Sequence, residues 1–207
     1  ADILAVQAKG LDGQVLLRHM VGFGGLGVFG EVPRFTETRA IKLYKGVLGT
    51  LFGDLGPFFV GLALAMVQWR LKRLAGRVPP MALTLDGEEV PPETWGAVLA
   101  LNGDLGRDFP LGRGLSLGSG TFRVILLRYK GVHHLPGLLK ACKRGHLLDD
   151  PERYGAVVRT VRSLTVRPAD SRPYAVNVDG LRMTARGELS VSVSGRVRLV
   201  AGQAALA

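Results

Sequence analysis

Residues 174–200 read YAVNVDGLRMTARGELSVSVSGRVRLV. In the second half of this stretch, apolar residues recur at every second position, which is typical of a strand with one buried face. The residues on that face are Leu189, Val191, Val193, Val197 and Leu199. Asp179-Gly180 can form a tight turn after the strand-like run Tyr174–Val178, and Gly195 predicts a bend or turn further on. The stretch therefore predicts antiparallel β-structure.

The same pattern extends outward through most of the chain. Asp12-Gly13 and Asp86-Gly87 repeat the turn signal between short apolar runs, as in antiparallel β-proteins. The further predicted strands are Ile3–Ala8, Gln14–Val21, Met81–Leu85, Trp95–Leu101, Thr121–Tyr129 and Ser163–Arg167. The 29 glycines follow no Gly-X-Y period, which excludes collagen. The fold class expected is mainly β, an antiparallel β-sandwich in one domain over residues 1–207.

Three segments depart from the strand pattern. Apolar residues at helical spacing predict two adjacent helices inserted near the N-terminus, at 38–52 and 57–75, and a further short helix at 135–144. Residues 47–67 are apolar enough to suggest a membrane span, but Asp54 and Pro57 interrupt them. The sequence favours a helix pair that is buried against a sheet or lines a lipid pocket.

The glycine-rich segment GFGGLG at 22–27 matches the dinucleotide-binding fingerprint and follows a predicted strand. That fingerprint requires a helix to begin directly after the glycines. Residues 28–33, VFGEVP, are poor helix formers. We therefore expect a tight glycine loop where chain segments pack closely, and no nucleotide site.

Charge and composition limit the classes of partner. The chain has 27 Lys and Arg against 17 Asp and Glu, a net charge of +10. An anionic membrane surface and a merely solvated basic surface both remain open. Nucleic acid is less favoured, because no aromatic residues interleave with the basic ones. The single cysteine, Cys142, excludes an intramolecular disulfide. The spacing of the four histidines predicts no metal site.

From Met81 onward, several motifs together resemble the diacylglycerol kinase family, which includes the sphingosine and ceramide kinases. These motifs are VLALNG at 98–103, LGSGTFRVILLR at 117–128, LPGLLKACKRGHL at 135–147, VNVDG at 176–180 and the ending SVSGRVRLV. Members have an N-terminal nucleotide-binding domain and a C-terminal β-sandwich that helps to form the lipid site. The chain resembles the second domain alone, and it opens with Ala-Asp like a piece of a longer polypeptide.

The resemblance implies a lipid-binding domain of an ATP-dependent lipid kinase, which transfers phosphate to a lipid hydroxyl such as that of diacylglycerol or a sphingoid base. ATP and Mg²⁺ would belong to the full-length enzyme. The expected partners are a lipid substrate, an anionic membrane surface, the N-terminal nucleotide-binding domain and, as a further option, a second copy in a homodimer. The expected location is cytoplasmic, peripheral at the inner membrane surface.

The resemblance places catalysis at Asp179 and Gly180; the alternative, which the missing glutamate favours, is that these residues form only a hairpin turn, like Asp12-Gly13 and Asp86-Gly87. The family's Asp-Gly-Glu motif has Leu181 in its third place here, and Leu181 can neither accept a proton nor bind Mg²⁺. The places of acidic metal ligands in relatives fall on Gly114, Ser119 and Arg123, so that metal site is expected to be lost. The alternatives are a non-catalytic lipid-binding or regulatory module and a basic nucleic-acid-binding β-domain. The expected lipid-binding side chains are Phe58, Phe59, Leu62, Met66 and Trp69.

Overall fold

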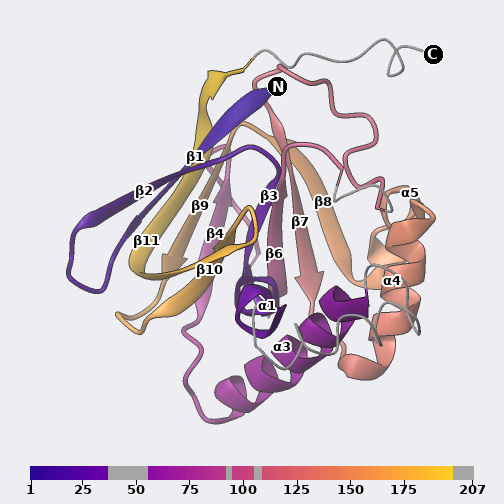
Figure 1. The fold of residues 1–207 in the computed structure, drawn as a ribbon, viewed down its shortest axis with the longest axis horizontal. Coiled ribbons are helices and arrows are strands. Elements are labelled where there is room, and N and C mark those ends of the chain that lie inside the picture. Colours follow the sequence, from indigo (N-terminus) through magenta and orange to yellow (C-terminus); the bar gives the residue numbers. More distant parts are fainter. Residues whose placement is uncertain (37–55, 92–94, 105–108, 198–207) are drawn as a thin grey trace.

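The computed structural model describes residues 1–36, 56–91, 95–104 and 109–197, and only the backbone of residues 56–59. These residues form one curled antiparallel sheet of eleven strands with helices on one of its faces (Figure 1). The mainly-β, sandwich-like fold expected from the sequence is thereby confirmed. The predicted helix at 38–52 lies outside the described residues.

The strands follow the order β5-β4-β9-β11-β10-β3-β6-β7-β8, with β1 on β11 and β2 on β1. Their bounds are β1 Asp2–Lys9, β2 Val15–Met20, β3 Phe23–Gly27, β4 Met81–Leu85, β5 Glu88–Glu89, β6 Trp95–Leu101, β7 Phe122–Arg128, β8 Ala156–Val161, β9 Ser163–Pro168, β10 Tyr174–Val178 and β11 Leu181–Arg196. The helices are α1 Val28–Thr36, α3 Gly56–Leu74, α4 Leu135–Lys143 and α5 His146–Asp149, with single 3₁₀ turns at Val132–His134 and Glu152–Tyr154.

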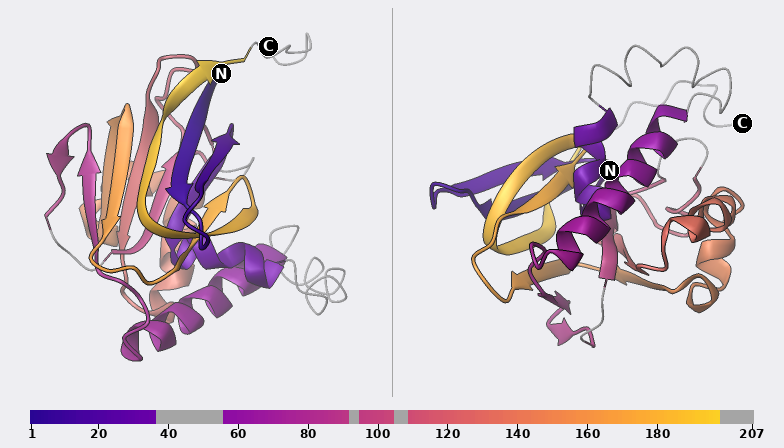
Figure 2. Two further views of the ribbon diagram at one scale, coloured as in Figure 1. Left: turned by 90° about the vertical axis from the view of Figure 1, so that its left-hand side faces the viewer. Right: turned by 90° about the horizontal axis from the view of Figure 1, so that it is seen from below.

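Strand β11 joins the two layers of the sandwich. Its first residues, from Leu181 to Ala185, pair with β10. Its later residues pair with β1 on one side and with β9 on the other. The register shifts between these halves at Gly187, which has a φ of 77° and whose carbonyl accepts a hydrogen bond of 2.7 Å from the Tyr174 hydroxyl. One strand therefore bends from one layer into the other, as Figures 1 and 2 show.

In the layer formed by β3, β6, β7 and β8, the central strands β6 and β7 are buried on both faces along most of their length. Val98 and Ala100 of β6 point into the core between the layers, whereas Ala97, Leu99 and Leu101 point to the opposite side, beneath the helices. This alternation explains why β6 appears in the sequence as an uninterrupted apolar run. The second core lies between this outer face and α1, α3, α4 and α5, and it holds the cavity described below.

The glycine segment corrects one sequence prediction. Residues 23–27 form strand β3 between β6 and β10 rather than a loop, and helix α1 begins directly after them. A Cβ atom on Gly27, whose φ is 67°, would lie 2.3 Å from the Gly96 carbonyl oxygen, so close packing at the glycines was correctly expected. The backbone N–H and C=O groups of this segment form the hydrogen bonds of the sheet with β6 and β10.

Helix α1 forms although Pro33 lies inside it. Proline has no N–H to donate to the carbonyl four residues earlier, that of Phe29. The Asn177 side chain of β10 donates to this carbonyl instead, at 3.4 Å. Gly30 brings the helix close to β10, because a Cβ atom there would meet the Ala175 carbonyl oxygen at 2.3 Å. Tertiary contacts thus stabilise a helix that local propensity disfavours.

A buried acidic side chain ties the helices to the sheet. The Glu31 side chain of α1 is 7% exposed and forms ion pairs with Lys72 of α3 and with Arg182 of β11, the latter at 3.4 Å. Burial of a carboxylate requires such partners. The contact fixes α3 across α1, and α3 forms one wall of the cavity.

Other predicted elements match closely. The predicted helix at 57–75 is α3, and the predicted helix at 135–144 is α4. Strand β8, which runs antiparallel to β7, was not expected from the sequence. β11 continues through Gly195 to Arg196, so the bend predicted at Gly195 is instead a register shift in its pairing with β1.

Candidate functional site

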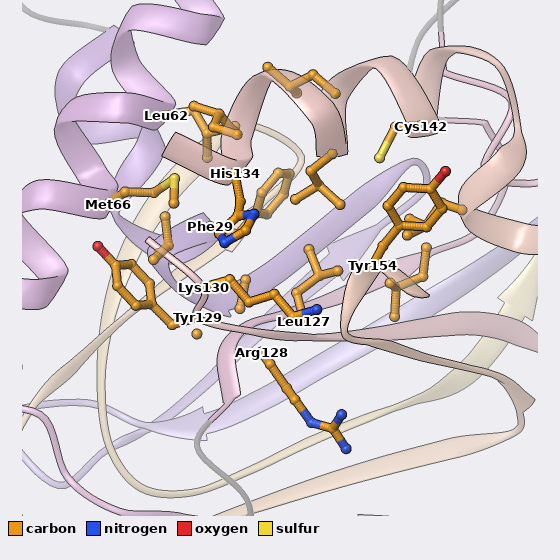
Figure 3. A pocket seen from close by; sticks show the side chains of 18 of the residues that line it. Phe29, Leu62, Met66, Leu127, Arg128, Tyr129, Lys130, His134, Cys142 and Tyr154 are labelled. Atoms are coloured by element: carbon orange, nitrogen blue, oxygen red, sulfur yellow. The ribbon is translucent and has the colours of Figure 1, made fainter. Parts of the chain in front are cut away.

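A cavity of about 320 Å³ lies between the helices and the outer face of β6 and β7. Its walls come from α1, α3, α4 and α5, and its floor comes from the two strands (Figure 3). The cavity is lined by Val28, Phe29, Leu62, Met66, Gly96, Ala97, Leu99, Phe109, Leu111, Ile125, Leu127, Arg128, Tyr129, Lys130, Gly131, His134, Leu135, Gly137, Leu138, Leu139, Cys142, Leu147, Arg153 and Tyr154.

Most of this lining is aliphatic or aromatic. Such a surface gives polar ligands few partners but favours hydrocarbon, at about 0.8 kcal/mol for each buried methylene. The volume lies at the lower end of the range of small-molecule sites. Leu62 and Met66 of α3 face Phe29 and the α4 side chains across the cavity in Figure 3. The arrangement can hold an apolar chain.

The polar residues of the lining are all basic or neutral. Arg128, Lys130, His134 and Arg153 contribute to it, and no Asp or Glu does. The Arg128 guanidinium lies 5.8 Å from the Trp95 ring centroid, and in Figure 3 it points away from the cavity. Lys130 is exposed and forms no ion pair with any residue that the structure describes. The lining therefore carries basic side chains and no acidic ones, which suits an anionic group better than a cationic one.

Two lining residues have unusual environments. The Tyr129 ring packs on Trp69 with centroids 5.2 Å apart, and its buried hydroxyl has no hydrogen-bond partner in the described part of the chain. The Cys142 side chain is buried, and this burial raises the pKa of its thiol to about 12. Cys142 is therefore a neutral thiol at physiological pH and a weak nucleophile.

The sequence-predicted lipid-binding residues are only partly brought to this cavity. Leu62 and Met66 line it. Trp69 is buried one turn further along α3 and contacts the lining residue Tyr129. The side chains of Phe58 and Phe59 lie outside the described residues. Binding of a lipid by these residues stays a prediction.

Asp179 and Gly180 lie elsewhere, in the two-residue turn between β10 and β11. Both have positive φ values, 47° and 85°. The Asp179 carboxylate accepts hydrogen bonds from the backbone N–H groups of Val21, Gly22 and Phe23, at 2.8, 3.0 and 2.8 Å. It thereby anchors the β2–β3 turn, at the end of β3 remote from α1. This contact gives Asp179 a structural task, and its catalytic role stays a prediction.

The turn at Asp86-Gly87 is built in the same way. Asp86 has a φ of 50°, and its carboxylate accepts hydrogen bonds from the N–H groups of Arg162 and Ser163 in the neighbouring turn. An Asp-Gly turn that captures the backbone of an adjacent turn is thus a repeated building element in this fold. Leu181, which follows Asp179-Gly180, is 63% exposed.

Arg123 and Gly114 occupy two of the positions where the family resemblance places acidic metal ligands. The Arg123 guanidinium is buried, and its Nη1 donates hydrogen bonds of 2.8 Å to the carbonyl oxygens of Leu111 and Arg113. Burial, with a smaller effect of the Arg113 charge, lowers the pKa of Arg123. Its positive charge lies against the carbonyls of the loop that contains Gly114. Within the described residues, no group of three His, Cys, Asp or Glu side chains could hold a metal ion.

Sequence reasoning missed most of the cavity. Phe29 was assigned to a non-helical segment, and Tyr129, Lys130, His134 and Tyr154 carried no motif. The one usable signal was the continuous apolar run of β6, because a strand buried on both faces must have a second core on its outer side.

None of the described helices is both long enough and apolar enough to cross a bilayer. No family model matches the sequence, and no curated protein does. The fold, by contrast, matches solved structures. A "putative diacylglycerol kinase" from Bacillus anthracis str. Sterne aligns with a TM-score of 0.53 and 15% identity, over 94% of this chain and 54% of that one.

Two further structures from the same organism, described as a diacylglycerol kinase and a putative one, align at a TM-score of 0.47 and 13% identity. The chain spans about half the length of these proteins. The likeness predicted from the sequence motifs is therefore confirmed as a shared fold: this chain is built like one half of the Bacillus protein.

Proposed function

We propose that this chain is the lipid-binding domain of an ATP-dependent lipid kinase, which transfers phosphate to a lipid hydroxyl such as that of diacylglycerol or a sphingoid base. The observation that carries the proposal is the apolar cavity, whose lining has basic but no acidic side chains, in a fold shared with half of a "putative diacylglycerol kinase". The apolar chain of the lipid occupies the cavity between α3, α4 and β6. The polar end lies near Lys130 and His134.

In this proposal, the cavity contributes binding and orientation. Phosphoryl transfer depends mainly on positioning of the two reactants and on stabilisation of charge. A lipid whose chain is held in a fixed cavity presents its hydroxyl at a defined place, which removes much of the entropy cost of bringing the reactants together. Leu62 and Met66, which line the cavity, would contact the bound chain.

The described residues do not fit a Mg²⁺ site at the family's Asp-Gly-Glu place. The Asp179 carboxylate is already engaged by three backbone N–H groups, and Leu181 has no ligand atom. We propose, from the family resemblance alone, that ATP and Mg²⁺ are bound by a separate nucleotide-binding domain of the full-length protein.

The first experiment measures lipid uptake by the cavity. A fluorescent single-chain fatty acid, used below its critical micelle concentration, reports binding by the purified chain. Leu138→Trp narrows the cavity and should weaken binding at least about tenfold, since several methylenes lose their contacts. Leu148→Trp is the matched control, because Leu148 is half-buried on α5 but does not line the cavity. Equal binding by both variants would refute lipid binding in this cavity.

The second experiment tests activity with the full-length polypeptide. Transfer of labelled phosphate from ATP to dispersed diacylglycerol or sphingosine should be detected, and Leu138→Trp should lower kcat/KM for the lipid while leaving the KM for ATP unchanged. Binding of lipid without any transfer would refute the kinase assignment. It would favour the second candidate function, a non-catalytic lipid-binding module, for which the aliphatic Leu181 is the supporting observation.

A further inference from the structure

The outward face of α3 carries a line of exposed apolar side chains. Leu64, Val67, Leu71 and Leu74 are 44, 46, 61 and 76% exposed. Their spacing of three, four and three residues places them on one side of the helix. We call these four residues the α3 stripe. The opposite side of the same helix supplies Leu62 and Met66 to the cavity.

Cations lie at the C-terminal end of the stripe. Arg70 lies between Val67 and Leu71 in the sequence, and Arg77 lies three residues after Leu74, the last residue of the helix. Both side chains are exposed, and neither has an ion-pair partner among the described residues. Lys72 points inward to Glu31, and Arg73 lies over the Trp69 ring. Exposed leucines and unpaired arginines on one helix face are typical of helices that lie in a membrane interface.

We propose that the α3 stripe is a docking surface for an anionic lipid bilayer, with α3 lying flat in the interface and its inner face toward the cavity. A helix of 19 residues extends about 28 Å, enough for several lipid headgroups. Figures 1 and 2 show α3 at the periphery of the molecule, at the end opposite the N-terminus. Docking on this face places the cavity next to the membrane that supplies its lipid.

Charge favours the bilayer over a second copy of the chain. A two-fold interface built on the stripe would bring together two chains that each have a net charge of +10. An anionic leaflet instead attracts Arg70 and Arg77 while the leucines enter the apolar layer. The proposal extends the proposed function to the route of lipid entry, but it does not require phosphate transfer.

The test is sedimentation with vesicles of phosphatidylcholine alone and with a minority of phosphatidylglycerol. The chain should bind the anionic vesicles more tightly, and added salt should weaken this binding. Leu71→Gln combined with Leu74→Gln should lower the partition coefficient at least about tenfold. The matched control is Val15→Gln combined with Leu17→Gln, because these strand residues are also exposed, at 60 and 55%. The control should bind like the wild type.

The charge contribution is tested with Arg70→Gln combined with Arg77→Gln. This variant should lose up to about thirtyfold in binding to anionic vesicles at low salt, and little with phosphatidylcholine alone. Lys9→Gln combined with Arg18→Gln removes the same charge from the exposed β1–β2 hairpin and should have a smaller effect. Equal losses from both charge pairs would overturn the assignment to α3.

Three other results would also overturn the proposal. The first is unchanged vesicle binding by the leucine variant. The second is a dimer in analytical ultracentrifugation that this variant dissociates, which would make the stripe an interface between copies. The third is a full-length polypeptide destabilised by the variant without any change in vesicle binding, which would show that another domain covers the stripe.

Uptake of the fluorescent fatty acid separates this proposal from the proposed function. The stripe variants should bind the probe like the wild type, because their side chains do not line the cavity. Loss of probe binding together with vesicle binding would overturn the docking assignment. Vesicle binding that depends on the stripe in a chain that takes up no probe would support docking and refute the lipid cavity.

Discussion

Asp179 provides a direct measure of what an Asp-Gly turn contributes to this fold. The change is Asp179→Ala, which removes three hydrogen bonds to the N–H groups of residues 21–23, at 2.8–3.0 Å. The net value of one such bond is about 1 kcal/mol, and alanine at a φ of 47° costs about 1 kcal/mol more. Because the turn is exposed, water partly compensates the N–H groups. The expected loss in free energy of unfolding is about 3 kcal/mol.

The assay is denaturation by urea, followed by tryptophan fluorescence. Asp179→Asn is the intermediate variant: it keeps an Oδ1 acceptor for Gly22 and Phe23 but faces Val21 with an amide. It should lose about 1 kcal/mol. Asp12→Ala is the control, because within the described part of the chain Asp12 accepts a single backbone hydrogen bond, from Gln14 at 3.1 Å. A loss for Asp179→Ala no larger than that for Asp12→Ala would refute the anchoring role.

Three further predictions concern close packing, a buried carboxylate and the cavity thiol. Gly27→Ala should lower the free energy of unfolding by about 3 kcal/mol or more, because its Cβ would lie 2.3 Å from a carbonyl oxygen and its φ is positive. Gly103→Ala is the control: its Cβ would meet nothing within 4 Å, so the free energy of unfolding should change little. Equal effects of the two substitutions would contradict the packing argument. Glu31→Gln should lower the free energy of unfolding by about 2 kcal/mol, because the buried Glu31 side chain pairs with two cations. Glu188→Gln breaks an exposed ion pair with Arg167 and should lower it by less than about 1 kcal/mol. A larger loss from Glu188→Gln than from Glu31→Gln would be inconsistent with burial as the cause. The rate at which iodoacetamide alkylates Cys142 in the folded protein should keep rising beyond about pH 9, because burial raises the pKa of the thiol to about 12. In the unfolded chain the alkylation rate should level off near pH 9. A plateau near pH 9 in the folded protein would show that the thiol is not buried.

The strands were predictable because their alternation is local. The runs at 81–85, 95–101 and 174–178 appear in the structure as β4, β6 and β10 with the same bounds. The helix α3 was predictable from its length and its apolar spacing. In these segments, propensity, periodicity and turn chemistry all favour the same structure.

The errors occur where tertiary contacts decide. Helix α1 contains two residues that disfavour helices, Gly30 and Pro33. It forms because the Asn177 side chain donates a hydrogen bond to the Phe29 carbonyl and because Gly30 packs closely on the Ala175 backbone. These partners are almost 150 residues away in the sequence, so no window around α1 contains the information. The cavity was missed for the same reason. Its lining combines side chains from many elements that are distant in the sequence, and only Leu62 and Met66 were anticipated.

The long strand β11 has a consequence for how the chain folds. It pairs with β1, β9 and β10, so the two layers close only when residues separated by up to about 190 positions meet. Proteins dominated by such distant pairings fold slowly, because the entropy cost of closing the intervening loop comes before the contacts that stabilise the closed state. Until β11 docks, three neighbouring strands present unpaired backbone edges, which are templates for aggregation. The strand that unites the sandwich is therefore also its kinetic bottleneck, and production of the protein should be most sensitive to substitutions there.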